Sequence, residues 1–540
     1  MTRLVSALDP KSDEFQKNRK DMLSLLDHVR ELEQRVVRLS EKQKERFHKA
    51  GKLLPRERID ALLDPGSPFI ALSSLAGYKM HEDDGEENVL GGCVITGIGF
   101  VAGTRVALIV SDSAIKGGTG TWAGGEKTLR LQKIAAEQKL PVVNLVESGG
   151  GNLRLTYLTF AVMGGRRFAN QARLSSAGLP QVTVVHGNAT AGGAYVPGMS
   201  DYVIVVRDQS KMFLAGPPLL KMATGEIADD EELGGAQMHA AIAGTAEWIT
   251  ENDAHGVAKA REAVANLNWQ MDTETVGQTE VKQPLYDPDE LAGVVPIDYR
   301  QPVDVREIVA RIADGSEFLE HKEEFDEYTI CGWVHINGFK AGVIGNNGPI
   351  TAKGAVKAAQ FIQLCDQVGT PLIFLQNTTG FIVGKDAETA GIIKHGAKLI
   401  QAVANARVPR ITIMVGASFG AGNYAMCGRG YDPDFLFTWP NHRIAVMGGE
   451  QAAGVLEIVA RGSAKRLGKE VNEDKLASQR DDIVAHYDRT SSALYATSQV
   501  WDDGIIDPRD TRRILGECLA ITNGAQHRSP CPSTFGAARL

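Results

Sequence analysis

Apolar and polar residues follow different patterns in successive parts of the 540-residue chain. Between residues 15 and 50, leucines recur at helical spacing among charged side chains, which predicts a long exposed helix. The pattern of residues 51–69 then predicts turns and a helix. From about residue 90, β-branched runs alternate with Gly-rich turns, and residues 440–500 return to a helical pattern. Strands that alternate with helices predict an α/β fold.

The strand-like part of the chain contains an internal repeat. The segment KLPVVNLVESGG (139–150) resembles GTPLIFLQNTTG (369–380), because each is an apolar strand that follows a proline and ends in a Gly turn. A longer segment, 178–206, resembles 407–439 in the same way. The prolines of the two pairs are separated by 230 and 229 residues. Two ordered pairs at nearly one offset predict a duplicated domain, and the polar, Pro-bearing stretch 272–290 predicts the linker.

One loop resembles a nucleotide-binding loop, GGTGTWAGGEKT at 117–128. A phosphate-binding loop has its lysine directly after the second glycine. Here Glu126 stands between Gly125 and Lys127, which places a carboxylate where a phosphate would lie. The same layout of strand, Gly turn and helix recurs at 341–365. A loop present in both halves of a duplicated chain is predicted to belong to the scaffold rather than to an ATP site.

Composition narrows the class of protein. Hydrophobic residues make up 43% and charged residues 23%, as in globular proteins with a large core. The formal charge of −8 argues against nucleic acid as a partner. The six cysteines form no CxxC motif, and no His/Glu motif has metal-ligand spacing, so no metal site is expected. No apolar run approaches about 18 residues and the first residues resemble no targeting signal, so we expect a cytoplasmic protein without membrane contact.

Each half of the repeat carries a cluster of small residues after an apolar strand, at 190–195 and at 419–424. Small residues let a ligand approach the backbone, and N–H groups at the start of a helix stabilise developing negative charge. Two such donors form an oxyanion hole. Close helix packing also requires small residues, but the recurrence of the cluster favours the functional interpretation.

No side chain stands out as the base. His186 precedes the first cluster and His395 lies in a predicted helix, but lone histidines are usually structural. Glu147 and Asp201 stand near turns without an obvious partner. Two oxyanion holes without a protein base suggest that a cofactor or the substrate supplies the base.

Several long motifs together resemble the carboxyltransferase β subunit of biotin-dependent acyl-CoA carboxylases, from about residue 8 to the C-terminus. They are GKLLPRERID, ESGGGNL, TAGGAYVPGMSD, FLAGPPLLKMATGE, ELGGAQMH, GVIGNNG, FLQNTTGFIVGKD, GASFGAGNYAMCGRGYDPDFLFTWPN and VMGGEQAAGVL. The 3-methylcrotonyl-CoA and geranyl-CoA carboxylases are the branch that they resemble best.

The resemblance implies two tandem crotonase-like domains, each a ββα spiral, with residues 1–285 on the acyl-CoA side and residues 286–540 on the biotin side. It implies a ligase in which carboxybiotin from a separate biotinylated α subunit releases CO2, the biotin nitrogen accepts a proton from the acyl-CoA, and the enolate captures CO2. It further implies that the acyl-CoA and biotin sites meet across a subunit dimer, within a β6 core of an α6β6 complex. The carrier tripeptide Met-Lys-Met is absent and no ATP-binding module is evident, so neither covalent biotin nor ATP is expected on this chain.

The resemblance also implies the roles of individual residues. The N–H groups of Gly192 and Gly193 would bind the thioester oxygen, and those of Ala421 and Gly422 the ureido oxygen of biotin. Further residues expected at the acyl-CoA site are Gly149, Gly150, Phe168, Ala169, Ala191 and Ala194. Further residues expected at the biotin site are Thr379, Gly380, Phe381 and Gly420.

Departures from the family pattern leave the length of the substrate's acyl chain undecided. The family implies a branched unsaturated acyl-CoA such as 3-methylcrotonyl-CoA. The apolar stretch 154–165 and Ala169, which stands where the branch commonly has a phenylalanine, favour a roomier pocket and a longer chain such as geranyl-CoA. His186 and Tyr202 replace a Met and a Glu expected there. A biotin-dependent decarboxylase subunit and a non-catalytic structural β subunit are the alternative functions.

Overall fold

The computed structural model describes residues 2–81, 83, 90–152, 154–269, 272–468, 470–533 and 536. The chain forms two compact units. The N-terminal unit comprises Arg30–Val276, Ser498–Val500 and Ile521–Leu540. The C-terminal unit comprises Met1–Val29, Gly277–Thr497 and Trp501–Ala520. The change of unit after Val276 lies within the predicted linker 272–290, and each unit also takes in a terminal segment from the other half of the sequence.

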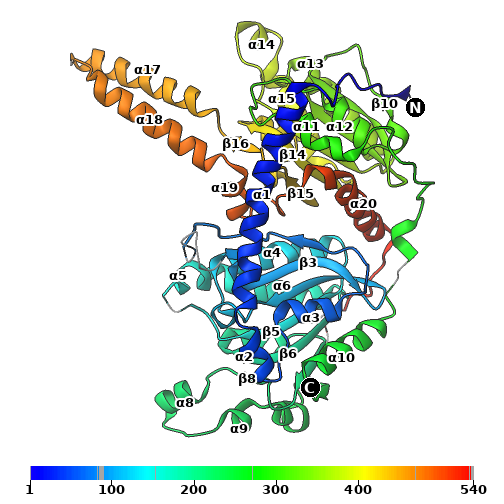
Figure 1. The fold of residues 1–540 in the computed structure, drawn as a ribbon, viewed down its shortest axis with the longest axis vertical. Helices are drawn as coiled ribbons and strands as arrows, with labels where there is room; N and C mark the ends of the chain where they lie inside the picture. Colours follow the sequence, from blue (N-terminus) through cyan, green and yellow to red (C-terminus); the bar gives the residue numbers. More distant parts are fainter. Residues whose placement is uncertain are drawn as a thin grey trace. The chain divides into compact units, whose positions relative to one another are not determined.

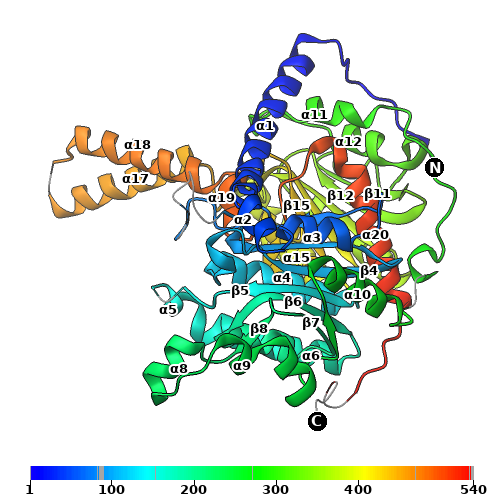
Figure 2. The same cartoon turned by 60° about the horizontal axis from the view of Figure 1, so that its bottom comes forward.

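The N-terminal unit is built on an eight-stranded sheet (Figures 1 and 2). The strand order is β2-β3-β4-β5-β6-β7-β9, with β8 beside β6. The pairs β2/β3 and β3/β4 are antiparallel, and all later pairs are parallel. The strands are β2 (Ile70–Leu72), β3 (Val94–Val101), β4 (Thr104–Ser111), β5 (Val142–Ser148), β6 (Gln181–Thr190), β7 (Tyr202–Val206), β8 (Lys211–Phe213) and β9 (Trp248–Thr250).

The C-terminal unit contains a second eight-stranded sheet with the order β1-β10-β11-β12-β13-β14-β15, and β16 beside β14. Antiparallel pairing again comes first, up to β12, and parallel pairing follows. The strands are β1 (Thr2–Arg3), β10 (Glu317–Glu320), β11 (Thr329–Ile336), β12 (Phe339–Asn346), β13 (Leu372–Thr378), β14 (Arg410–Phe419), β15 (Phe435–Thr438) and β16 (Arg443–Ala445).

The two sheets repeat one design. In each, parallel strands follow the antiparallel ones, namely β5, β6, β7 and β9 in one sheet and β13, β14 and β15 in the other. The longest strand of each sheet carries a short extra partner, β8 or β16. Each also has a register irregularity at the same place, between Val146 and Ser148 and between Gln376 and Thr378. The α/β class predicted from the alternating pattern is confirmed. The repeat found in the sequence therefore corresponds to the parallel core strands and the turns after them.

Helices of the N-terminal unit pack on its sheet, and α10 contacts β6 and β7. Apolar side chains that the sequence places in β-branched runs, such as Leu108, Val143 and Val184, are fully buried between these layers. The helices are α2 (Lys44–Lys49), α3 (Pro55–Leu62), α4 (Trp122–Glu137), α5 (Thr156–Thr159), α6 (Gly165–Ser176), α7 (Tyr195–Gly198), α8 (Pro217–Thr224), α9 (Asp230–Gly234) and α10 (Asp253–Ala265).

The C-terminal unit has a corresponding core, in which α13 and α15 pack together and α13 contacts β11. The hairpin of α17 and α18, orange in Figure 1, covers the helical pattern predicted at 440–500. The helices are α11 (Leu291–Val294), α12 (Val305–Ile312), α13 (Ala352–Gln367), α14 (Lys385–Thr389), α15 (Ile392–Asn405), α16 (Gly422–Ala425), α17 (Gly449–Leu467), α18 (Glu473–Thr490) and α19 (Ala493–Ser498). The chain also has α20 (Thr511–His527), which runs from this unit into the N-terminal one.

The structure differs in two respects from the long exposed helix predicted at 15–50. The helix is divided into α1 (Asp13–Glu41) and α2, with a turn between them. It is also not exposed all round, because a stripe of apolar side chains at helical spacing, including Met22, Leu26, Val29 and Val36, is buried. The charged residues fill the opposite face. In the described part of the chain, no helix is both long and apolar enough to cross a membrane.

Candidate active site

A sharp strand-to-helix turn ends the longest strand of each unit. In the N-terminal unit, β6 ends at Thr190, and a 3-10 turn at Ala191–Ala194 leads into α7. Ala191 has φ +53°, a left-handed conformation that is unusual for a residue with a Cβ. The N–H groups of Gly192 and Gly193 stand at the start of this helical turn, where a helix has no internal acceptor for its first donors.

The turn in the C-terminal unit has the same form. There β14 ends at Phe419, Gly420 has φ +56°, and α16 starts at Gly422. Gly420 therefore occupies the place of Ala191, and Ala421 and Gly422 the places of the two glycines. Ala421 is exposed, while Gly422 is buried. Both units thus present backbone N–H groups, with little side chain around them, at the end of a parallel strand.

A second turn lies beside each of these, at the end of the adjacent strand. Gly150 (φ +98°) follows β5, and its carbonyl accepts a 2.8 Å hydrogen bond from the N–H of Gly120. Gly380 (φ +111°) follows β13, and its carbonyl accepts a 2.9 Å hydrogen bond from the N–H of Ile350. Because β5 and β6 are parallel neighbours, as are β13 and β14, the predicted residues gather at one edge of each sheet.

Two hydroxyl groups that the sequence reasoning did not select hold these second turns. The Ser148 hydroxyl donates to the carbonyl of Gly118 at 2.8 Å and accepts from the N–H of Gly150 at 3.2 Å. In the other unit, the hydroxyl of Thr378 donates to the carbonyl of Gly348 at 3.1 Å and accepts from the N–H of Gly380 at 3.2 Å. A hydroxyl residue at matching positions of the repeat was the signal that could have identified them.

The two turns differ in how much space they leave. A Cβ on Gly422 would lie 2.9 Å from the Cα of Gly380 and 3.0 Å from the Thr378 methyl group. A Cβ on Gly193 would instead have its nearest neighbour, the Cβ of Ser148, at 4.0 Å. The turn of the C-terminal unit is therefore closely packed against the adjacent turn, while that of the N-terminal unit is more open.

The remaining predicted acyl-CoA residues lie around the open turn. Phe168 and Ala169 are on α6, and the Cζ of Phe168 is 3.5 Å from the position of a Cβ on Gly192. The rings of Phe168 and Tyr195 meet edge to face at 5.8 Å. The buried side chain of Gln171 donates to the carbonyl of Val196 at 2.7 Å, which fixes α6 against α7.

A cavity of about 380 Å³ lies beside Gly149. Arg46 brings positive charge to it, while Lys52, also in its lining, is paired with Glu147. In the C-terminal unit, Thr379 is exposed and the ring of Phe381 packs over Gly396 of α15, 3.0 Å from where a Cβ would lie.

Comparison with known proteins identifies this arrangement. The model of the carboxyl transferase domain family matches residues 46–534. The chain belongs to the carboxyl transferase family. It is an enzyme of this kind, and the family predicted from the sequence motifs is confirmed.

Relatives of this carboxyl transferase cover its whole length. The solved structure of the P. aeruginosa geranyl-CoA carboxylase β subunit has 55% identity, covers 100% of both chains and has a TM-score of 0.92. A probable biotin-dependent acyl-coenzyme A carboxylase β2 subunit from Mycobacterium tuberculosis is 46% identical over 99% of this chain and 100% of the relative. A probable mitochondrial methylcrotonoyl-CoA carboxylase β chain from Drosophila melanogaster is 44% identical over 99% and 95%.

Behind the first turn of the carboxyl transferase lies a buried charged network. Glu147, the residue before Ser148, binds Lys52 at 2.7 Å, Arg58 at 2.8 Å and the hydroxyl of Ser113 at 2.8 Å. Burial alone would raise the pKa of Glu147, but the charges of Arg58 and Lys52 outweigh it and lower the pKa. The carboxylate is therefore ionised and held by cations, which suits a structural role rather than that of a base.

Two other side chains considered as bases, His186 and Asp201, are also engaged. His186 is completely buried, and its Nδ1 lies 2.8 Å from Asp253. Burial and the charge of Arg58 lower the pKa of His186, so the ring is neutral. Asp201 accepts hydrogen bonds from the hydroxyl of Ser175 at 2.5 Å and the N–H of Gln181 at 2.8 Å. His395 lies in the first turn of α15 beside Gly391.

The loop that resembles a phosphate-binding loop has a structural explanation. Thr121 caps α4 by accepting from the N–H of Gly124, and Lys127 turns into the protein, where its Nζ donates to the carbonyls of Gly91 at 3.2 Å and Val94 at 2.7 Å. In the other unit, Thr351 caps α13 and the buried Lys357 donates to the carbonyl of Asp326 at 3.2 Å. The lysine thus belongs to the repeated scaffold. Among the described residues, no three His, Cys, Asp or Glu side chains are grouped as metal ligands.

Proposed function

We propose that this chain is the carboxyltransferase β subunit of a biotin-dependent acyl-CoA carboxylase, and that it transfers CO2 from carboxybiotin on a separate α subunit to an acyl-CoA. The observation that carries the proposal is the pair of equivalent turns, at Gly192–Gly193 and Ala421–Gly422, in a chain of the carboxyl transferase family. A reaction that generates an enolate next to a ureido group needs two sets of fixed donors, and each unit provides one.

The turn of the N-terminal unit is proposed to bind the thioester. The N–H groups of Gly192 and Gly193 would donate to the oxygen as it gains charge, and fixed donors of this type contribute about 10²–10³ in rate. The open space above Gly193 leaves room for the thioester carbon. Ala191, Ala194, Phe168 and Ala169 would border the acyl chain. The cavity beside Gly149 and Gly150, with Arg46 and Lys52, would accept the anionic part of CoA.

The turn of the C-terminal unit is proposed to bind biotin. Its residues suit a neutral ureido oxygen, because the exposed Ala421 and the closely packed Gly422 offer N–H donors without a charged side chain. Gly420, Thr379, Gly380 and Phe381 would complete this site. Carboxybiotin, when bound, supplies CO2 and then the base. This agrees with the engagement of His186 and Glu147 in buried contacts of their own.

The assembly is part of the proposal. We infer that the units are two tandem crotonase-like domains. The N-terminal unit, which contains most of the expected range 1–285, lies on the acyl-CoA side, and the C-terminal unit, which contains most of 286–540, lies on the biotin side. The partner is a biotinylated α subunit with biotin carboxylase activity, and the β chains form a hexamer within an α6β6 complex in the cytoplasm. In that arrangement the acyl-CoA turn of one chain faces the biotin turn of another.

For the substrate we propose a branched unsaturated acyl-CoA of the length of geranyl-CoA. The 55% identity to the geranyl-CoA carboxylase β subunit, compared with 44% to a methylcrotonoyl-CoA carboxylase β chain, supports the longer chain. The small side chain of Ala169 and the exposed apolar residues Tyr157 and Phe160, within the apolar stretch 154–165, support it as well.

The test is fixation of labelled bicarbonate by the purified chain with a biotinylated α subunit and ATP. Geranyl-, 3-methylcrotonyl-, propionyl- and acetyl-CoA would be compared at equal concentration. We expect the highest kcat/KM with geranyl-CoA. A preference for 3-methylcrotonyl-CoA would disprove the substrate proposal but leave the carboxyltransferase function intact. Absence of fixation with every thioester, with an α subunit proven active on another β subunit, would disprove the function.

A further inference from the structure

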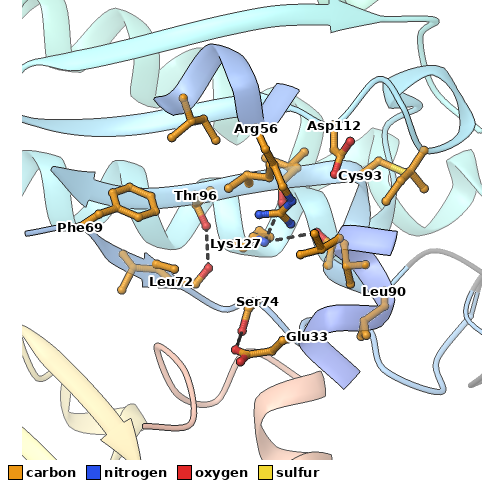
Figure 3. Close-up of a pocket in the computed structure, with 18 of the residues that line it drawn as sticks. Glu33, Arg56, Phe69, Leu72, Ser74, Leu90, Cys93, Thr96, Asp112 and Lys127 are labelled. Carbon is orange, nitrogen blue, oxygen red and sulfur yellow. Dashed lines mark hydrogen bonds between the residues drawn. The ribbon is translucent and has the colours of Figure 1, made fainter. Parts of the chain in front are cut away.

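The N-terminal unit contains a cavity that the proposed reaction does not use. It has a volume of about 470 Å³, within the range of roughly 300–1,000 Å³ typical of small-molecule sites. Figure 3 shows it between segments of α1, α3 and β3, with Lys127 of α4 at its base. Among the described residues that line it, none belongs to the proposed acyl-CoA site. Apolar side chains form most of the wall, namely Val36, Val37, Ile59, Leu63, Phe69, Leu72, Leu90, Val94, Ile95 and Ile115.

Arg56 brings a positive charge to this cavity, and the carboxylates of Glu33 and Asp112 are close enough to be affected by it. Its guanidinium group projects from α3 toward Lys127 (Figure 3). It forms no ion pair with any described residue, and its Nε is buried without a hydrogen-bond partner. Arg58, by contrast, has carboxylate partners in Glu147 and Asp253. A buried donor without an acceptor is destabilising, so Arg56 is poised to bind an anion.

Lys127 and Asp112 lie at the same end of the cavity. The Nζ of Lys127 has two carbonyl partners, which leaves one of its three hydrogens available. Burial, with a contribution from Arg56, lowers the pKa of Lys127 to about 7. Burial also raises the pKa of Asp112, whose Oδ2 is buried without a partner. Burial thus favours the uncharged form of each group, and Arg56 remains the cation that an incoming anion would neutralise.

The acidic residues limit the charge of the ligand. Glu33 lies on the opposite side of the opening, where its carboxylate accepts from the hydroxyl of Ser74 at 2.6 Å. A phosphate with two negative charges would be repelled by the nearby acidic side chains more strongly than a carboxylate, which has a single charge and the planar shape that pairs with a guanidinium. The apolar wall requires an aliphatic tail.

We propose that this cavity binds a small aliphatic carboxylate, with the head group on Arg56 and Lys127 and the tail against the apolar wall that includes Val37 and Ile95. The Oδ2 of Asp112 lies at the head-group end and can share a proton with the carboxylate. The site is separate from the acyl-CoA turn and is proposed independently of the carboxyltransferase function.

Isothermal titration of the full chain with sodium octanoate tests the proposal. One site per chain is expected. Arg56→Gln is expected to weaken binding about tenfold or more, because a charge-assisted pair is lost. Arg173→Gln, at an exposed arginine on α6, is the matched control and should leave the affinity unchanged. Octanamide and octylamine keep the tail but lack the negative charge. Their affinity for the native chain should be no higher than the affinity of octanoate for the Arg56→Gln variant.

A second pair of variants locates the site. Val37→Trp fills the cavity from α1 without altering its charge, and should abolish octanoate binding. Phe168→Ala alters the proposed acyl pocket and should not. Size-exclusion profiles and melting temperatures of the variants confirm that they fold. Unchanged octanoate affinity in folded Arg56→Gln or Val37→Trp, equal binding of octylamine, or no binding to the native chain would each overturn the proposal.

Discussion

Gly422 and Gly380 approach so closely that a Cβ on Gly422 would lie 2.9 Å from the Cα of Gly380. The two residues belong to adjacent turns, after β14 and β13, so the position of each N–H depends on the other. A side chain at either position must displace backbone, not the tip of a flexible side chain.

We therefore expect Gly422→Ala to lower kcat of the carboxyl transfer by about 10²-fold or more, because it displaces the N–H donors of the turn. Gly430→Ala is the matched control, since Gly430 is exposed and a Cβ there has no neighbour within 4 Å. The readout is labelled-bicarbonate fixation by assembled complex. A Gly422→Ala enzyme with native kcat would refute the role of this turn.

Gly192 offers a graded test in the other unit. Its Cβ would meet only the Cζ of Phe168 at 3.5 Å, an ordinary contact, so Gly192→Ala should fold and retain most activity. Gly192→Val adds branches beside Phe168 and over the N–H groups, and should reduce kcat/KM for the acyl-CoA about 10²-fold. Steady-state kinetics of both variants would measure this. Equal activity of the two variants would show that the thioester does not approach this turn.

The hydroxyl of Thr378 is expected to stabilise the second turn of the C-terminal unit. Thr378→Val keeps the shape of this buried side chain but leaves the N–H of Gly380 and the carbonyl of Gly348 without their partner. The free energy of unfolding should fall by about 1–3 kcal/mol. Denaturant titration measures the change, with Thr379→Val at the exposed neighbouring position as the control. If both variants lose the same amount, the hydrogen bonds of Thr378 are not what matters.

Asp502 should make the stability of the C-terminal unit depend on pH. The residue is buried, its Oδ2 accepts from Thr438 at 2.6 Å, and burial raises its pKa from 3.8 to about 6. The folded state therefore binds a proton more readily than the unfolded state. This contribution is complete below pH 3.8 and is lost as the pH rises through about 6.

Asp502→Asn removes this titration. The melting temperature of the variant minus that of the native protein should therefore be higher at pH 7.5 than at pH 4.5. The difference corresponds to at most about 3 kcal/mol. Differential scanning calorimetry across this range measures it. A constant difference at all pH values would show that Asp502 titrates normally.

The proposed pairing of turns across a subunit dimer predicts complementation. Gly192→Val impairs one type of turn and Gly422→Val the other, so each homogeneous complex should be nearly inactive. In a mixed dimer, one of the two sites would combine the two intact turns. Co-expressed chains with different tags, purified through both tags, should therefore regain activity. No recovery would contradict the pairing across chains.

Much of this architecture could be predicted from the sequence, because it is repeated. The twin strands, the small-residue turns and the α/β class followed from apolar runs that end in glycine, and the positive φ values of Gly150 and Gly380 explain those glycines. The division of the helix at residues 42–43 carried no Pro or Gly signal, and its buried stripe was obscured by many charged residues.

The contacts of single polar residues could not be predicted. Ser148 and Thr378 act through hydrogen bonds to residues 30 positions earlier in the chain. Glu147 and His186 gained their partners, Lys52, Arg58 and Asp253, only through folding. Local pattern contains no information about such pairings, which is why these residues remained candidates for a base until the structure placed them.

The central claim is that two equivalent turns in one chain catalyse carboxyl transfer to an acyl-CoA. The most direct measurement is the rate at which native chain, Gly192→Val and Gly422→Val fix labelled bicarbonate into geranyl-CoA with the same biotinylated α subunit and ATP. We expect fixation by the native chain and a loss of about 10²-fold or more in each variant with assembly intact. Native rates in either folded variant, or no fixation by the native chain with a proven α subunit, would contradict the claim.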